Sequence, residues 1–310
     1  MLEYSKWKGW VTVVVGDRKT PSTWKADKVV FLSLDEQYNT FPAFAKAINE
    51  NTYVRKMVGY LYAIKNGADF IFETDDDNIP YCNALDVIEK DVIDDKKIKC
   101  IESSNGWLNI YKEFGATDAW PRGYPIQLLH SFAETKISDS HLPWDVCQYL
   151  ADEDPDVDAI FRITKGQRIF FKRDHQFGLA YNSFSPFNSQ ATLWKKEAFP
   201  LLFLPVGVTD RVTDILRGYI SLACLKKKGS TLKVASPVVY QHRNVHNLLK
   251  DFEQEADLYL HAENWARALM HIDGNNMIEL FKSALLALID RQFLKADNLD
   301  LYNDFIREIS

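Results

Sequence analysis

One stretch in the first third of this chain restricts its possible folds more than any other. Residues 53–66 carry apolar side chains at helical spacing, and Gly67 follows them as a helix stop signal. Residues 69–74 (DFIFET) then predict a strand, which runs directly into three aspartates at 75–77. A helix followed by a strand at this spacing is typical of α/β proteins, in which ligands bind beyond the carboxyl ends of parallel strands. The stretch therefore predicts an α/β fold with three carboxylates at a ligand-binding edge.

The rest of the chain adds strands and helices around this stretch. Residues 103–190 are rich in Pro, Gly, Asn and aromatic residues, and they predict long functional loops rather than a second compact domain. From residue 248 onward the apolar spacing is helical. The other expected elements are strand 10–15, strand 28–32, helix 82–92, strand 97–102, strand 191–195, helix 213–227 and strand 231–240.

The charge balance and the cysteines exclude several classes of protein. Because 43 Asp and Glu residues outnumber 37 Lys and Arg residues, the net charge is −6, which argues against nucleic-acid binding. The four cysteines are widely spaced and form no CxxC pair, which is typical of a reducing compartment. No apolar run approaches the ~20 residues that span a bilayer, and the first strand begins too early for a signal peptide. We therefore expect a soluble, cytoplasmic chain without a transmembrane segment.

The acidic run, residues 75–77, is the strongest candidate for a metal site. Three adjacent carboxylates repel one another, and a divalent cation with oxygen ligands relieves that repulsion and can bridge to phosphates. For such a run taken alone, an acidic turn in solvent is the better interpretation. Its position directly after a strand, and the Asn78-Ile79-Pro80 segment that follows it, shift the balance toward a metal site.

Two earlier segments have features of a nucleotide site. Gly16 and Asp17 end the first predicted strand, where a carboxylate can hydrogen-bond a base or ribose and glycine lets a ligand approach; an ordinary turn explains them equally well. Arg55 and Lys56 open the predicted helix before the acidic run. Because cations oppose the dipole at a helix N-terminus, a bound diphosphate would compensate them, and a solvated helix face is the alternative.

Later segments add candidate ligands and a candidate base. Residues 241–246 (QHRNVH) follow a predicted strand, so that an imidazole could complete a metal shell and Arg243 could pair with phosphate. Asp214 falls in the first turn of a predicted helix, where it either supports the helix end or removes a proton from an attacking hydroxyl. Asp156 and Asp158 (DPDVD) are open to the same ambiguity, with a turn as the structural interpretation.

Taken in order, these segments resemble the STELLO-type glycosyltransferase family. Each segment is weakly specific, but the ordered set, which runs from about residue 10 to 255, is specific. A more distant similarity is to plant reversibly glycosylated polypeptides, which act as UDP-arabinose mutases and share a DDD and a DVDA-like stretch. The segments that carry the resemblance are VVVGDRKTP, LSLDEQ, YVRKMVGYLYAIKNGADFIFETDDDN, WPRGYPI, DPDVDAIFRIT, FSPFNSQATLWKKEAFPLLFLP, RVTDILRGYI and QHRNVHNLLKDFEQE.

The resemblance implies a GT-A-like fold, in which a Rossmann-type mixed, mostly parallel sheet flanked by helices binds a nucleotide sugar. It also implies a DXD motif that holds Mn²⁺ or Mg²⁺, with Asp75 and Asp77 as its aspartates and Asp77 as the stronger ligand. His246 matches the segment that commonly supplies a third ligand. His242 is a rival for that role, because QHRN stands where a QERN-like segment is expected.

The resemblance further implies roles for the remaining candidates. Asp214 lies where inverting members of such families have their base, and Asp156, Asp158 and Arg162 are candidates on the acceptor side. The residues expected to bind the donor nucleotide and its diphosphate are Gly16, Asp17, Arg18, Arg55, Asp75, Asp76 and Arg243.

The expected domain organisation follows from the same resemblance. A GT-A-like catalytic domain is expected over 1–247, with a nucleotide-sugar half at about 1–105 and an acceptor half at about 106–247. A helical C-terminal extension is expected over 248–310, and it is a candidate surface for a homodimer.

Three hypotheses for function remain. The first is a metal-dependent glycosyltransferase that moves a sugar from a UDP-sugar donor to a hydroxyl of a glycan or polysaccharide acceptor, with inversion and with Asp214 as base. The second is a UDP-sugar mutase, which needs no acceptor. The third is a non-catalytic scaffold that acts through its helical tail.

Overall fold

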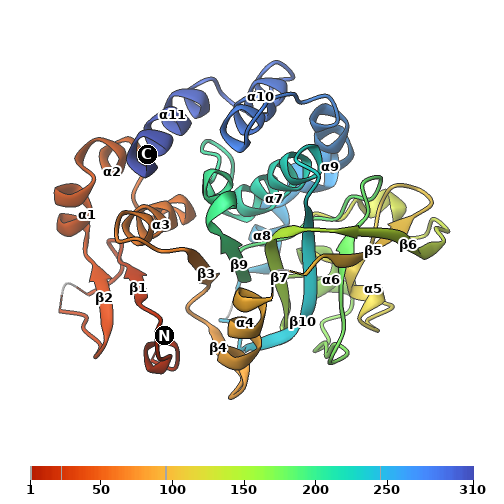
Figure 1. Ribbon diagram of the computed structural model, residues 1–310, viewed down its shortest axis with the longest axis horizontal. Helices are drawn as coiled ribbons and strands as arrows, with labels where there is room; N and C mark the ends of the chain where they lie inside the picture. The colour runs from red at the N-terminus through yellow and green to blue at the C-terminus, as the bar shows by residue number, and fades with distance from the viewer. Residues whose placement is uncertain (1, 22, 95, 245) are drawn as a thin grey trace.

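The computed structural model describes residues 2–21, 23–94, 96–244 and 246–310, in which helices surround two sheets (Figure 1). The strands are β1 (Thr12–Val15), β2 (Val29–Leu32), β3 (Phe70–Thr74), β4 (Asn78–Pro80), β5 (Ile98–Ser103), β6 (Thr135–Leu142), β7 (Trp144–Glu153), β8 (Gln176–Leu179), β9 (Ala191–Lys195) and β10 (Thr231–Gln241). The α-helices are α1 (Leu34–Thr40), α2 (Pro42–Ala47), α3 (Lys56–Lys65), α4 (Ala84–Ile93), α5 (Ile110–Glu113), α6 (Ala159–Thr164), α7 (Asp210–Lys227), α8 (Leu248–Gln254), α9 (Ala256–Leu269), α10 (Met277–Ile289) and α11 (Asp297–Ile309). Short 3-10 helices are η1 (Tyr4–Lys6), η2 (Tyr53–Arg55), η3 (Ile126–Leu128) and η4 (Lys196–Leu202).

The main sheet is mixed and runs in the order β3-β9-β7-β10-β8-β5-β6, with β4 paired to β10. Its centre is the parallel pair β7 and β10, and β3 joins at one end by antiparallel pairing with β9. Helices cover the sheet, and the chain ends in a run of helices, as Figure 1 shows. The expected α/β class, with a GT-A-like sheet flanked by helices and a helical C-terminal extension, is confirmed.

Strand β7 explains why the main sheet needs helices on both faces. Successive side chains point to opposite faces of a strand. In β7, Val146 and Leu150 therefore pack into the core beneath α7, while Cys147 and Tyr149 pack into a second core with α4. The expectation of loops throughout residues 103–190 is wrong here, because a strand buried on both faces lacks the polar alternation by which strands are recognised.

Strands β1 and β2 form a small parallel sheet of their own, with Val13 opposite Val30. The spacing of strand, helix and strand indicated that β2 and β3 belong to one parallel sheet. Instead, β2 pairs with β1, and β3 pairs antiparallel with β9 in the main sheet. Helix α3 ends where Gly67 adopts a φ of 80°, the conformation expected of a glycine stop. It packs closely on β1, because a Cβ added to Gly59 would lie 2.8 Å from Val15 Cγ2.

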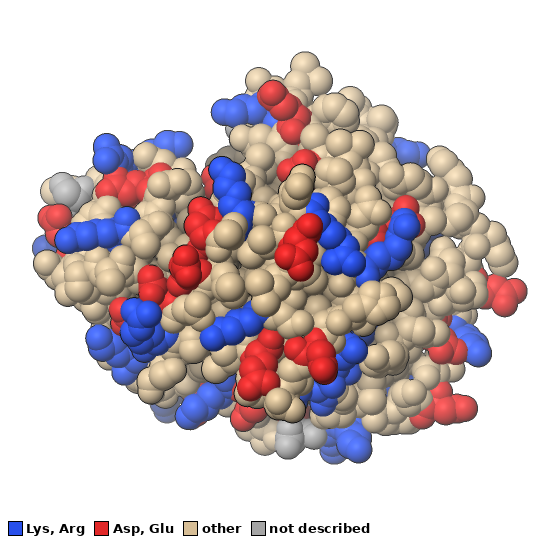
Figure 2. Space-filling view, turned by 90° about the horizontal axis from the view of Figure 1, so that it is seen from above, with Lys and Arg blue, Asp and Glu red and all other residues tan. Residues whose placement is uncertain are grey.

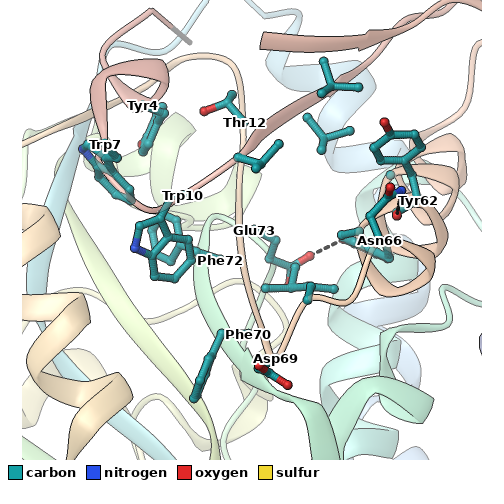
Figure 3. A pocket seen from close by; sticks show the side chains of 18 of the residues that line it. Tyr4, Trp7, Trp10, Thr12, Tyr62, Asn66, Asp69, Phe70, Phe72 and Glu73 are labelled. Atoms are coloured by element: carbon teal, nitrogen blue, oxygen red, sulfur yellow. Dashed lines mark hydrogen bonds between the residues drawn. The ribbon is translucent and has the colours of Figure 1, made fainter. Parts of the chain in front are cut away.

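An apolar cleft of about 1020 Å³ separates the two sheets, and we name it the inter-sheet cleft (Figure 3). Strands β1 and β3 and helix α3 supply most of its walls. Aromatic side chains of the N-terminal segment line one end, where Trp7 packs 5.7 Å from Phe72 between ring centroids. The labelled lining residues are Tyr4, Trp7, Trp10, Thr12, Tyr62, Asn66, Asp69, Phe70, Phe72 and Glu73.

Helix α7 crosses the molecule and is buried along almost its whole length. Its Arg217 forms an ion pair with Glu73 of β3, with 2.6 Å between Nη2 and Oε1, and neither side chain is exposed. The helix begins at Asp210, with Thr209 as its N-cap. The expectation that Asp214 lies in the first turn is therefore wrong, because Asp214 lies one turn further in.

The C-terminal helices are part of the same core. Phe281 of α10 stacks on Tyr302 of α11 with ring centroids 4.6 Å apart, and Phe305 lies 5.8 Å from Phe44 of α2. The apolar faces of this extension are thus packed largely within the chain, and its use as a homodimer surface stays a prediction. Among the helices of the described residues, none has both the length and the apolar character needed to cross a membrane.

Candidate functional site

A cavity of about 620 Å³ lies where β1, β3 and β10 end, and we name it the edge cavity. Charged and polar side chains make up much of its wall, in contrast to the inter-sheet cleft. Its ionisable lining residues are Asp17, Tyr53, Arg55, Lys56, Asp75, Asp76, Asp77, Arg122, Asp156, Asp210, Arg211, Asp214, Arg243 and His246. Most of the candidates chosen from the sequence are thus brought to one place.

The register between β4 and β10 brings the acidic run to the end of β10. Asn78 lies opposite Gln241, so that the residues before β4 and those after β10 meet at the same edge. Gln241 Nε2 donates a hydrogen bond of 2.7 Å to Asp77 Oδ2. Arg243 and His246, which follow β10, line the same cavity.

Asp77 is only half satisfied. Its Oδ1 atom is buried and has no hydrogen-bond partner within the described part of the chain. Burial raises the pKa of the Asp77 carboxyl, and the neighbouring charges of Asp75 and Asp76 raise it further, while the hydrogen bond from Gln241 acts against them. A buried carboxylate oxygen without a partner is costly, so this atom is available to a cation or a donor.

Asp75 differs from Asp77 because it already has a cation. Lys56 Nζ lies 2.8 Å from Asp75 Oδ1, and the hydroxyl of Tyr53 donates to the same oxygen at 2.7 Å. Asp76, between the two, is exposed. The three aspartates of the run therefore present three different environments.

Two arginines, Arg243 and Arg211, also line the edge cavity. Arg243 donates to Asp251 at 2.9 Å, and Arg211 donates through Nε to Glu255 at 2.9 Å. Burial first, together with the positive charges of Arg162 and Arg211, lowers the pKa of Arg243 to about 10. A buried guanidinium beside other positive charges is unfavourable, and a bound anion would relieve it.

Arg122 joins two buried carboxylates at the cavity wall. Its guanidinium donates to both oxygens of Asp156, at 2.7 and 2.8 Å, and to Asp214 Oδ2 at 3.1 Å. Burial raises the pKa of Asp214, and Asp156 adds to that effect, although Arg122 opposes it. Burial also acts to raise the pKa of Asp156, but there the closer Arg122 prevails and the pKa is lowered. Two carboxylates that share one arginine thus differ in their affinity for a proton.

Two of the expected donor-binding residues lie outside the cavity lining. A Cβ on Gly16 would lie 2.7 Å from the Phe31 ring, so packing against β2 accounts for this glycine. Arg18 is exposed and pairs with Glu50. Asp17 does line the cavity, but its carboxylate accepts hydrogen bonds from the backbone N–H of Arg18 at 2.8 Å and of Asn51 at 2.6 Å.

Arg55 contributes to the cavity wall, but its guanidinium is engaged elsewhere. It donates to Gln37 Oε1 at 3.1 Å and to the carbonyl oxygens of Ala45 and Ile48 at 2.7 and 3.3 Å. Arg55 is 3% exposed. These contacts hold α1 and α2 against η2, and in the described chain it is the next residue, Lys56, that reaches the acidic run.

Three further candidates have structural contacts outside the edge cavity. Asp158 caps α6, accepting from the backbone N–H of Phe161 at 2.8 Å and from Trp120 Nε1 at 2.6 Å. Arg162 donates to Asp154 at 3.1 Å. His242 lies 3.4 Å from Glu153, whereas His246 lines the cavity. Of the two interpretations of Asp158, the structure therefore supports the structural one, a helix cap.

Sequence reasoning missed Arg122, Gln241 and Arg211 as site residues. Arg122 lies in the WPRGYPI segment, and Gln241 opens the QHRNVH segment, so both were marked by the ordered motifs. Arg211 precedes Asp214 by nearly one helical turn, which places both on one face of α7. In each case the sequence showed only that the residue lies in or beside a motif. It did not show the tertiary contact that brings the residue to the edge cavity.

No group of three or more His, Cys, Asp or Glu side chains in the described ranges is already arranged to hold a metal ion. His246 Nδ1 lies 3.4 Å from Asp251 rather than at the acidic run. Figure 2 shows one face of the molecule, on which basic and acidic side chains are interspersed.

A GT-A-like sheet whose edge cavity brings an acidic run together with arginines defines the class of α/β protein to which this chain belongs. The chain is homologous to two Arabidopsis thaliana proteins named probable glycosyltransferases, which confirms the STELLO-type resemblance. It is 29% identical to STELLO2 over 283 residues and 27% identical to STELLO1 over 290 residues, in both cases over 86% of this chain. The aligned part is 36% of the length of each relative. No family model matches the chain.

Proposed function

We propose that this chain is a metal-dependent glycosyltransferase that moves a sugar from a UDP-sugar to a hydroxyl of a glycan acceptor. The observation that carries the proposal is the buried, unpartnered Oδ1 of Asp77 in a cavity that Arg211 and Arg243 also line. Such a cavity suits a ligand that brings both a cation and an anion. A nucleoside diphosphate with its divalent ion meets both requirements.

The residues at the edge cavity fit a divalent cation with oxygen ligands. Asp77 offers a free oxygen, Asp75 lies two residues before it, and His246 lines the same cavity. Mn²⁺ or Mg²⁺ held by these side chains would supply positive charge that stabilises the departing diphosphate. The carboxylate oxygens are the ligands that such hard ions prefer.

Arg243 and Arg211 are the residues proposed to bind the diphosphate. Both guanidinium groups are held in place by carboxylates, Asp251 and Glu255, so they need little reorganisation when a ligand arrives. Burial first, and then the nearby charges of Arg162 and Arg211, lower the pKa of Arg243, so a further anion beside it would be favourable. A diphosphate supplies this anion, with bidentate hydrogen bonds as the preferred geometry.

Asp214 is the proposed base. Its raised pKa, caused first by burial, makes its carboxylate a better proton acceptor than an exposed aspartate. The acceptor oxygen attacks the anomeric carbon as the bond from that carbon to the diphosphate oxygen breaks, and the hydroxyl proton passes to Asp214. Attack from the face opposite the leaving group inverts the anomeric configuration. Arg122 keeps Asp214 oriented, at 3.1 Å.

The proposal is tested by incubating the chain with UDP-sugars, Mn²⁺ and a panel of glycan acceptors, and by reading the anomeric configuration of the product by NMR. We expect an inverted glycoside, and we expect Asp214→Asn to lower kcat by roughly 10²–10⁴-fold, the usual contribution of a general base. A retained configuration would remove Asp214 from the base role. An isomerised UDP-sugar formed without any acceptor would instead establish a mutase, and failure to bind any nucleotide would leave the scaffold hypothesis.

A further inference from the structure

The side chain of Lys56 is fixed in the wall of the edge cavity. Its ammonium lies 2.8 Å from Asp75 Oδ1, and it donates to the hydroxyl of Tyr53 at 2.9 Å and to the carbonyl oxygen of Ser189 at 3.3 Å. The side chain is 19% exposed. Three acceptors thus surround one ammonium group, which has three donors.

The position of this lysine is not explained by the stability of its helix. Lys56 is the first residue of α3, where the helix dipole disfavours a positive charge. Its partner Asp75 is 30% exposed, so water screens part of the attraction between them. A partly screened pair at an unfavourable helix end contributes little to folding, and the partly exposed ammonium is accessible from the edge cavity.

The two outer aspartates of the acidic run therefore differ in what they can accept. Asp75 is compensated by Lys56, whereas Asp77 keeps a buried oxygen without a partner. A divalent ion that takes both aspartates must remove the ammonium from Asp75. A lysine has a flexible stem of four carbons, so the ammonium can move several ångströms while α3 stays in place.

We propose that Lys56 is a ligand-binding residue that occupies Asp75 in the free protein and moves to the phosphate oxygens of the donor when a divalent cation takes its place. This inference rests on the proposed function and gives Lys56, which the sequence already placed with Arg55 as a candidate beside a diphosphate, a second role at Asp75 in the free protein. In the free protein Lys56 competes with the cation for Asp75. In the complex it adds positive charge beside the diphosphate, in the cavity that Arg211 and Arg243 also line.

The proposal predicts effects of opposite sign for one substitution. In Lys56→Met the ammonium is gone, so Mn²⁺ alone should bind roughly tenfold more tightly. UDP in saturating Mn²⁺ should bind roughly 10–100-fold more weakly, the loss expected for a hydrogen bond to a charged group. Uridine, which has no phosphate, should bind with unchanged affinity. Isothermal titration calorimetry measures all three, and the melting temperature of the variant shows that it is folded.

Two further variants make the experiment decisive. Lys46→Met, which removes an exposed lysine of α2, is the matched control and should change none of the three affinities. In an Asp75→Asn background, Lys56→Met should no longer alter Mn²⁺ affinity, because the competition takes place at Asp75. If Lys56→Met leaves the affinities for Mn²⁺ and for UDP unchanged, the proposal is wrong.

The test separates this inference from the proposed function. If the wild-type chain binds Mn²⁺ but no uridine nucleotide, the proposed function fails, and so does the transfer of Lys56 to phosphate. Tighter Mn²⁺ binding by Lys56→Met would then establish the competition at Asp75 alone. If wild-type UDP binding is present and Lys56→Met weakens uridine as much as UDP, the proposed function stands and the phosphate contact of Lys56 is refuted.

Discussion

The inter-sheet cleft and the edge cavity share part of their walls, yet they differ in the state of their carboxylates. Glu73 lines the cleft, and it accepts hydrogen bonds from Arg217 at 2.6 Å and from Trp194 at 2.9 Å, as well as one from Tyr60. Asp77 lies at the edge cavity, four residues later, and keeps a buried oxygen without a partner. The larger hollow is thus the one whose buried carboxylate, Glu73, has both oxygens hydrogen-bonded within the protein. The size of a hollow does not identify the functional site, whereas a carboxylate oxygen left free at its wall is a reason to expect a ligand there.

The largest expected effect is on the ion pair beside the cleft. Arg217→Met leaves Glu73 as a buried charge without its ion-pair partner, so we expect the free energy of unfolding to fall by about 3–5 kcal/mol. Urea denaturation measures it. The matched control is Arg307→Met, which breaks an exposed pair with Asp304 and should cost less than about 1 kcal/mol. If both variants lose the same free energy of unfolding, the comparison fails, because the buried Glu73 would then depend on its ion pair no more than the exposed Asp304 does.

Asp158 extends the comparison to a carboxylate outside both hollows. Burial raises the pKa of Asp158 to about 6. An unfolded aspartate has a pKa of about 3.9, so between pH 4 and pH 6 the unfolded chain releases this proton before the folded chain does. Stability contributed by the protonated carboxyl is complete below pH ~4 and is lost as the pH rises through 6, by about 3 kcal/mol.

The measurement is the free energy of unfolding at a series of pH values in the wild type and in Asp158→Asn. The variant should lack this part of the slope between pH 4 and pH 6. Parallel curves for the two proteins would contradict this expectation, because they would show that the pKa of Asp158 is the same in the folded and the unfolded chain.

A smaller effect is expected where the N-terminal segment closes the cleft. The hydroxyl of Tyr4 donates to the carbonyl oxygen of Asn78 at 3.3 Å and lies 3.3 Å from Thr74 Oγ1. Tyr4→Phe removes these contacts and keeps the ring, so the free energy of unfolding should fall by about 1 kcal/mol. Thermal unfolding measures it. A loss as large as that of Arg217→Met would show that the segment is more than a cover for the cleft.

The smallest effect on stability is expected at Asp77 itself. Asp77→Asn removes a carboxylate whose ionisation is disfavoured by burial, so the free energy of unfolding at pH 7 should be unchanged or higher by about 1 kcal/mol. The pH dependence has the same sign as for Asp158, because a raised pKa means that ionisation favours the unfolded chain. If Asp77→Asn lowers the free energy of unfolding by more than about 1 kcal/mol, Asp77 is a structural carboxylate like Glu73, and the comparison is wrong.

Part of the edge cavity could be predicted from the sequence, because several of its residues come directly after strands. The acidic run comes directly after β3, and Arg243 and His246 come directly after β10, so the carboxyl ends of strands were enough to bring them together. The Lys56 contact was not accessible in this way. Consecutive residues on a helix point about 100° apart, and only packing against α1 and α2 decides that Arg55 turns to Gln37 while Lys56 turns to Asp75.

Other features depended on tertiary contacts that leave no periodic signal. Strand β7 is buried on both faces, so its sequence shows no alternation and its place at the sheet centre was missed. Asp156 and Asp158 are separated by one residue, yet one faces Arg122 in the edge cavity and the other caps α6. The helix boundary alone distinguishes them, and boundaries are the least predictable part of an element.

The most direct test of this account is calorimetric titration of UDP into the wild-type chain and into Asp77→Asn, each with and without Mn²⁺. If Asp77 is held unsatisfied for a cation that brings the nucleotide, wild-type binding will require Mn²⁺, and Asp77→Asn will lose at least about 2 kcal/mol of that binding, roughly 30-fold, with its fold intact. Equal binding of UDP with and without Mn²⁺, or by the two proteins, would contradict the account, as would the absence of any binding by the wild type.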